Sequence, residues 1–210
     1  MKTVPVYVGY DPKESISWHV FVQSIMETSS SPLSIHPVYV KNYRKIFNRV
    51  SDSKQSNEFS FSRFLVPYLQ NYQGTAIFMD CDMLMRTDIN ELYEIGKIHP
   101  EKAVHVVQHD YEPKDKIKYL GQAQHSYPRK NWSSVVVWNC GHKANKNVTP
   151  DFVNNGTGAE LHRFTWLKDK EIGSLDVSWN WLVGQYVDTD QKVNVKNVHW
   201  TVGGPYFDEY

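Results

Sequence analysis

Two aspartates, Asp80 and Asp82, directly follow an apolar run at residues 75–79. In an extended chain, this i, i+2 spacing puts both carboxylates on the same side, roughly 6–7 Å apart, with Cys81 facing away. Two carboxylates that close repel each other unless a cation or a proton lies between them. A hard divalent cation such as Mg²⁺ or Mn²⁺ takes oxygen ligands and keeps positions open for phosphate oxygens. A solvated turn or a pair of helix caps would also explain the spacing, but neither needs the apolar residues on both sides, so the sequence favours a metal role.

The elements that precede this pair form a strand, a helix and a second strand. Apolar residues alternate over positions 4–8, and Asp11 followed by Pro12 and Glu14 is a helix-start pattern. Apolar residues at i, i+3, i+4 and i+7 then mark one helix face; they are Trp18, Phe21, Val22 and Ile25. A second strand is expected at 35–40. A β-α-β opening favours an α/β sheet with ligands at the carboxyl ends of its strands.

Later segments predict further elements of the same kind. We expect a helix over residues 59–69 that carries Arg63 and that Pro67 kinks or ends. Asp88 and Glu91 predict the start of a short helix through residue 95. Buried strands are expected at 75–79, 103–107, 135–138 and 195–200. No repeat or linker interrupts the chain, so we expect one domain over residues 1–210.

Composition excludes several classes of protein. Lys and Arg together number 23, as do Asp and Glu, which gives a net charge of zero and argues against a nucleic-acid binder. No run approaches the ~18 apolar residues of a membrane span, and the first residues lack the pattern of a signal peptide. The sequence therefore predicts a cytoplasmic protein without a transmembrane segment, whose two cysteines are reduced and buried. Aromatic residues make up 14% of the chain, which suits a core or a sugar-binding surface.

An initial strand and four ordered motifs carry a resemblance that spans nearly the whole chain. The motifs are Phe61-Ser62-Arg63, Met79-Asp80-Cys81-Asp82, Trp138-Asn139-Cys140-Gly141, and His199 followed by Gly203-Gly204-Pro205. In type and order they resemble the GT-A-fold glycosyltransferases, above all the retaining group that contains glycogenin and the bacterial lipopolysaccharide galactosyltransferases. This resemblance implies an α/β fold, a single-domain Rossmann-like GT-A domain with a mixed sheet flanked by helices.

The same resemblance implies an activity and a set of site residues. The reaction would move a hexose, glucose or galactose, from a UDP-sugar to a saccharide, glycan or small-molecule acceptor with retention. Mn²⁺, or Mg²⁺, would be held by Asp80, Asp82 and His199. The nucleotide would contact Val8, Gly9, Tyr10, Asp11, Asp80, Cys81, Asp82, Gly203 and Gly204. Arg63 and Asn139 would contact the donor sugar. From the residues alone, His199 is equally read as a hydrogen-bonded strand-end histidine, and Asn139 as a strand-terminating turn residue.

The sequence departs from the resembled group at two places. Gly204 stands where the group has a lysine that meets the diphosphate, so backbone N–H groups of Gly203 and Gly204, or a base such as Arg129 or Lys130, would replace it. The Asp-Gln-Asp pattern of the group is missing. No nucleophile or base is assigned, and Asp110 and Asn180 are the catalytic candidates.

Two other functions would use some of the same residues. A haloacid-dehalogenase-like phosphatase also has a hydrophobic strand that ends in Asp-x-Asp, but it places this motif near the start of the chain. A non-enzymatic carbohydrate-binding domain would explain the aromatic residues but not a buried acidic pair. Metal-dependent transfer of a sugar therefore remains the favoured function.

Overall fold

A computed structural model describes residues 3–50, 55–110, 128–186 and 194–205. Its centre is a six-stranded sheet in the order β2-β1-β3-β6-β5-β7. The strands are β1 Val4–Gly9, β2 Leu33–Val38, β3 Thr75–Met79, β5 Val104–Val107, β6 Val135–Asn139 and β7 Ile172–Leu175. β6 runs antiparallel to both neighbours, while β1 is parallel to β2 and β3, and β5 is parallel to β7. The sheet is therefore mixed, as the resemblance implies.

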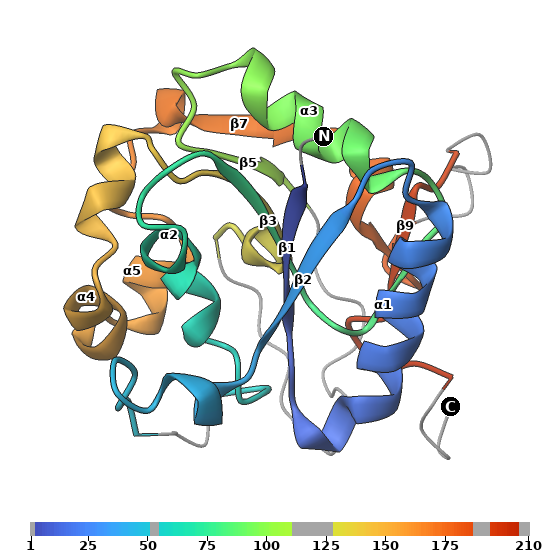
Figure 1. Ribbon diagram of the computed structural model, residues 1–210, viewed down its shortest axis with the longest axis horizontal. Coiled ribbons are helices and arrows are strands. Elements are labelled where there is room, and N and C mark those ends of the chain that lie inside the picture. The colour runs from blue at the N-terminus through green and yellow to red at the C-terminus, as the bar shows by residue number, and fades with distance from the viewer. Residues whose placement is uncertain (1–2, 51–54, 111–127, 187–193, 206–210) are drawn as a thin grey trace.

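Helices cover both faces of this sheet (Figure 1). α1 Ser15–Thr28 and α3 Ile89–Ile98 lie on one side, and α2 Val66–Leu69, α4 Pro150–Asn155 and α5 Gly158–His162 lie on the other. Short 3-10 helices connect several elements; they are Pro12–Glu14, Val40–Tyr43, Ser62–Leu65, Trp132–Ser134, Lys143–Asn147, Asp169–Glu171 and Val177–Asn180. None of the helices that the structure describes is long and apolar enough to cross a membrane.

A second, three-stranded sheet in the order β4-β9-β8 lies beside the carboxyl end of β3. Its strands are β4 Met83–Met85, β8 Trp181–Leu182 and β9 Asn197–His199. Met83 pairs with His199 in an antiparallel register. Residues 80–82 thus connect the two sheets, and the β4–β9 pairing brings the end of the chain back to them.

Several predicted elements have different limits. The second strand ends at Val38, and a 3-10 helix begins at Val40 instead. The helix expected over 59–69 is wrong as a single element: a 3-10 helix ends at Leu65 and α2 begins at Val66. Pro67 has no N–H to donate inside a helix, so it fits the first turn of α2 and not the middle of a longer helix.

The aromatic residues mainly build the core. Trp138 on β6 stacks on Trp166 at an interplanar angle of 8°, and Phe164 packs against both rings. Trp179 is also buried. The aromatic excess is therefore explained largely by packing between the sheet and the segments around α4 and α5. Both cysteines are free and buried, as predicted.

Candidate functional site

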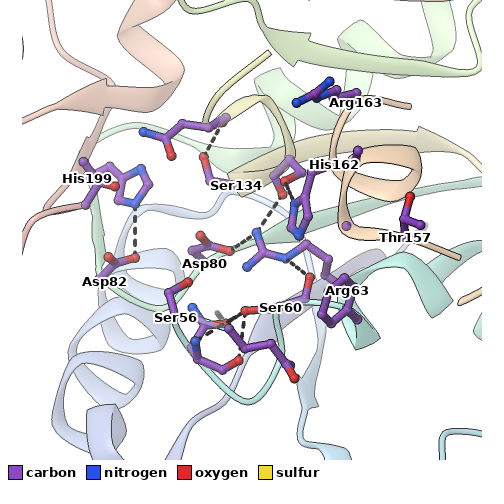
Figure 2. A pocket seen from close by; sticks show the side chains of 18 of the residues that line it. Ser56, Ser60, Arg63, Asp80, Asp82, Ser134, Thr157, His162, Arg163 and His199 are labelled. Atoms are coloured by element: carbon purple, nitrogen blue, oxygen red, sulfur yellow. Dashed lines mark hydrogen bonds and ion pairs between the residues drawn. The ribbon is translucent and has the colours of Figure 1, made fainter. Parts of the chain in front are cut away.

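The acidic pair lies at the carboxyl end of β3 and is fixed by backbone contacts on both sides. The Asp80 N–H donates to the Ser134 carbonyl, and the Asp82 carbonyl accepts from the Trp200 N–H. Ligand atoms of Asp80, Asp82 and His199 all lie within 4.8 Å of one another (Figure 2). The structure thus brings together the three residues predicted to hold a metal.

Arg63 neutralises one side of the pair. Its guanidinium lies 2.7 Å from Asp80 Oδ1 and also donates to the carbonyls of Ser60 and Ser133. The rings of Phe59 and Phe78 flank it, with centroids 5.2 and 5.1 Å from its Cζ. Because these contacts hold a buried charge beside a buried carboxylate, Arg63 has a defined position at the wall of the site.

His199 lies on the other side of the pair. Its Nε2 is 3.2 Å from Asp82 Oδ1, and its Nδ1 is 2.8 Å from Asn180 Oδ1. Both His199 and Asn180 are buried. When Nδ1 donates to Asn180, Nε2 carries a lone pair that faces a carboxylate oxygen. Such a pair of electron donors fits a divalent cation, since neutral imidazole and carboxylate are ordinary ligands of Mn²⁺ and related ions.

Cys81 points away from the other two residues of its motif. Its Sγ donates to Glu14 Oε2 behind the acidic pair. Burial, and then the charge of Asp82, raise the pKa of Glu14 to about 8. A protonated Glu14 is therefore expected at neutral pH, which avoids a third negative charge next to the pair.

These residues open into a cavity of about 620 Å³. This volume is in the range of pockets that bind small molecules. Asp80, Asp82 and His199 form one part of its wall, and Arg63, His162 and Arg163 contribute to the rest (Figure 2).

His162 lies among the arginines of the cavity wall but is itself uncharged at neutral pH. Its Nδ1 contacts Ser133 Oγ at 2.8 Å, and its ring packs against Phe61 and Phe64. Burial, followed by the charges of Arg63 and Arg49, lowers the pKa of His162 to about 3. At neutral pH the positive charge of this wall therefore comes from arginines.

Arg49 and Arg163 differ in what they contact. Arg49 Nη1 donates to three carbonyls around the end of α4, and its guanidinium lies over the Phe61 ring. Arg163 lines the cavity, and its buried Nε has no acceptor among the residues that the structure describes. Arg49 therefore braces the wall, whereas Arg163 can contact an anionic ligand.

Apart from Asp80 and Asp82, none of the residues predicted for the nucleotide lines the cavity. Val8 is buried, and a Cβ on Gly9 would lie 2.3 Å from the Phe59 ring. The Asp11 carboxylate accepts from the backbone N–H groups of Lys13 and Glu58, which ties the end of β1 to the loop before Arg63. Tyr10 makes edge contacts with aromatic rings, those of Trp18 and Tyr39.

The segment that follows His199 contributes to the cavity wall a residue other than the two glycines expected there. Gly203 and Gly204 are buried, and the Gly203 N–H donates to the Trp200 carbonyl. Among the described residues that follow His199, Thr201 lines the cavity and these two glycines do not.

Asn139, Asp110 and Asn180 lie outside the cavity wall. Asn139 pairs with Thr75, because β6 is antiparallel to β3, and its amide donates to the carbonyls of Pro100 and Lys102. It therefore lies at the opposite end of β3 from the acidic pair, and we leave it out of the proposed site. Asp110 is exposed, and Asn180 is buried behind His199.

The bases considered as replacements for the missing lysine also lie elsewhere. Arg129 donates to the carbonyl of Arg163 and pairs with Asp169 at 2.6 Å, and Lys130 is buried without lining the cavity. Sequence reasoning missed Arg163 and His162. A capping box at Thr157 and Glu160 could have revealed the start of α5, but not its approach to the acidic pair.

Solved structures share this fold at low sequence identity. A glycosyltransferase GlyE of Streptococcus pneumoniae matches with a TM-score of 0.64 and 13% identity, over 100% of this chain and 57% of that one. Mouse xyloside xylosyltransferase 1 matches with a TM-score of 0.58 and 13% identity, over 97% of this chain and 100% of that one. The bifunctional glycosyltransferase WbbM matches with a TM-score of 0.56 and 16% identity, over 96% of this chain and 46% of that one. The chain thus has the fold of GT-A-type glycosyltransferases, and it spans about half the length of WbbM and GlyE.

One curated relative defines the family. The chain is 47% identical over 213 residues to Protein CDI of Arabidopsis thaliana, which covers 100% of this chain and 82% of that protein. The chain belongs to the family of Protein CDI. No family model matches the sequence.

The lowered pKa of His162 predicts a loss of stability in acid. Its folded-state pKa lies below the unfolded value near 6.5, so the unfolded chain binds the extra proton, and stability falls as the pH drops from 6.5 towards 3. Between pH 7 and 5.5 this group should contribute a loss of about 1 kcal/mol. Urea unfolding of His162→Asn at both values should show a smaller pH dependence than the wild type. The variant of an exposed histidine, His19→Asn, is the control, and an unchanged dependence in His162→Asn would contradict the prediction.

Proposed function

We propose that this protein is a metal-dependent glycosyltransferase that takes its sugar from a nucleotide-sugar donor. The observation that carries the proposal is the convergence of Asp80, Asp82 and His199 at the wall of the cavity. The GT-A-type fold supports it, because the site lies at the carboxyl end of a central strand, where α/β sheets bind ligands. A bound divalent cation would supply Lewis-acid stabilisation of the diphosphate leaving group.

Each side chain at the cavity would have a distinct task. Asp80, Asp82 and His199 would hold Mn²⁺ or Mg²⁺. Arg63 would orient Asp80, and Arg163 would bind a phosphate oxygen in place of the lysine that Gly204 replaces. Charged donors fixed in a partly closed cavity stabilise developing negative charge with little reorganisation. The finer proposal is a UDP-hexose donor, glucose or galactose, with retention at the transferred carbon.

Neither alternative function is favoured by a specific observation. A phosphatase would use Asp80 as the nucleophile, whereas the structure pairs this carboxylate with Arg63. A carbohydrate-binding domain would present aromatic rings, but Trp132, Trp179, Trp181 and Trp200 are not among the described residues that line the cavity. We therefore retain the transferase as the proposed function.

Metal-dependent nucleotide binding tests this proposal. UDP at about 100 times its Kd should raise the melting temperature of the wild type by roughly 5–10 °C when Mn²⁺ is present. With EDTA in place of Mn²⁺ the shift should be lost, and Asp82→Asn should lose it as well. Asp151→Asn, which changes an exposed carboxylate on α4, is the matched control and should respond like the wild type. A wild type that UDP and Mn²⁺ do not stabilise, or one that releases phosphate from a generic phosphoester, would contradict the proposal.

Arg163 should affect the nucleotide and not the metal. A charge-assisted hydrogen bond contributes about 1.5–3 kcal/mol, so Arg163→Ala should weaken UDP binding in Mn²⁺ roughly 10-fold or more. Mn²⁺ binding without nucleotide should stay at the wild-type level. Calorimetric titrations of both ligands measure this, with Arg44→Ala, an exposed arginine outside the cavity wall, as the control. Equal UDP affinities in Arg163→Ala and the wild type would remove Arg163 from the site.

A further inference from the structure

Four hydrogen-bonding groups behind the acidic pair are connected in a chain with a single direction. Ser134 Oγ donates to the Asn131 carbonyl at 2.7 Å. Asn180 Nδ2 lies 2.8 Å from Ser134 Oγ, and Asn180 Oδ1 lies 2.8 Å from His199 Nδ1. Ser134, Asn180 and His199 are all buried.

The direction of this chain follows from its first acceptor. A backbone carbonyl can only accept, so the single hydroxyl proton of Ser134 is used on Asn131. Ser134 Oγ must then accept from Asn180, which requires the NH₂ end of the amide on that side. The carbonyl end of the amide is thereby turned towards His199, and Nδ1 of His199 must carry the proton.

A second contact is compatible with the same orientation of Asn180. Its Nδ2 also lies 2.9 Å from His109 Nε2, and the other ring nitrogen of His109 contacts the hydroxyl of Tyr186. Burial lowers the pKa of His109 to about 3, so this imidazole is neutral, and its one acceptor nitrogen is Nε2 when the Tyr186 hydroxyl accepts from Nδ1. A flipped amide would place Oδ1 at 3.4 Å from the Asn131 carbonyl, where two acceptors would repel each other.

We propose that Asn180, oriented by Ser134, is a positioning residue that presets His199 as the Nδ1–H tautomer. Nε2 is then the ring nitrogen directed at Asp82, the position from which it would bind a cation. The chain thus orients the third ligand before any metal arrives. Its consequence for catalysis rests on the proposed function, but the tautomer of His199 does not.

The tautomer is measured directly in metal-free protein labelled with ¹⁵N-histidine. Two-bond ¹H–¹⁵N correlation spectra distinguish Nδ1–H from Nε2–H, and loss of one signal set in His199→Gln assigns the residue. We expect Nδ1–H in the wild type and a mixture of tautomers in Asn180→Ala. Asn180→Asp, which keeps an oxygen facing Nδ1, should restore Nδ1–H. An Nε2–H wild type, or an Asn180→Ala spectrum identical to the wild type, would overturn the proposal.

A matched pair of serine variants covers the case in which Asn180→Ala does not fold. Ser134→Ala removes the acceptor that orients the amide, so His199 should become a mixture of tautomers. Ser133→Ala removes the neighbouring hydroxyl, which contacts His162 instead, and His199 should remain Nδ1–H. Identical His199 signals in both variants would overturn the proposal.

A second readout separates this inference from the proposed function. Mn²⁺ binding, followed by the electron paramagnetic resonance signal of the free ion, should weaken about 10- to 100-fold in Asn180→Ala and recover in part in Asn180→Asp. A His199 tautomer that depends on Asn180 in a protein that does not bind Mn²⁺ would support the positioning role and contradict the proposed function.

Discussion

The site depends on the repulsion between two carboxylates at the end of the central strand. With carboxylate oxygens no more than 4.8 Å apart, two unit charges repel by roughly 3.5 kcal/mol or more at an effective dielectric constant of 20. The protein lowers this cost on one side, where Arg63 pairs with Asp80. On the other side, His199 turns a ring nitrogen towards Asp82. Behind the pair, Glu14 holds its proton, because burial and the same charges raise its pKa to about 8. Negative charge remains on the acidic pair, and a divalent cation would balance it.

The two sheets of the fold meet at the acidic pair. β3 delivers the acidic pair, β4 continues the chain into the second sheet, and β9 pairs with β4 so that His199 returns to the pair. Asp11 ties the end of β1 to the loop before Arg63, and Phe59 packs on Gly9 beside it. Residues near the start of the chain therefore support the site from behind without lining the cavity. Contacts to a donor would come instead from Arg163 and the other residues that line the cavity.

Whether a feature of the fold or of the site could be predicted from the sequence depends on how far apart along the chain the contacting residues lie. The strand 75–79 and the Asp80–Asp82 pair are local patterns; the strand is confirmed, and the two carboxylates lie together at its end. His199 is distant along the chain, so only the resemblance pointed to it. The resemblance implies that Asn139 contacts the sugar, but an apolar pattern does not reveal the direction of a strand, and antiparallel β6 carries this residue to the far end. Arg163 and the orientation of Asn180 depend on how separate segments pack together, which no local pattern contains.

We propose that Asp80, Asp82 and His199 together hold a divalent cation beside a nucleotide diphosphate. Anomalous X-ray diffraction from crystals grown with Mn²⁺ and UDP tests it most directly, because the manganese signal locates the ion without reference to any assumed role. We expect one strong anomalous peak in contact with both carboxylates and with Nε2 of His199, with the diphosphate on its cavity side. Nucleotide bound in the cavity with no anomalous peak at these three residues, or manganese bound elsewhere, would contradict the proposed metal site.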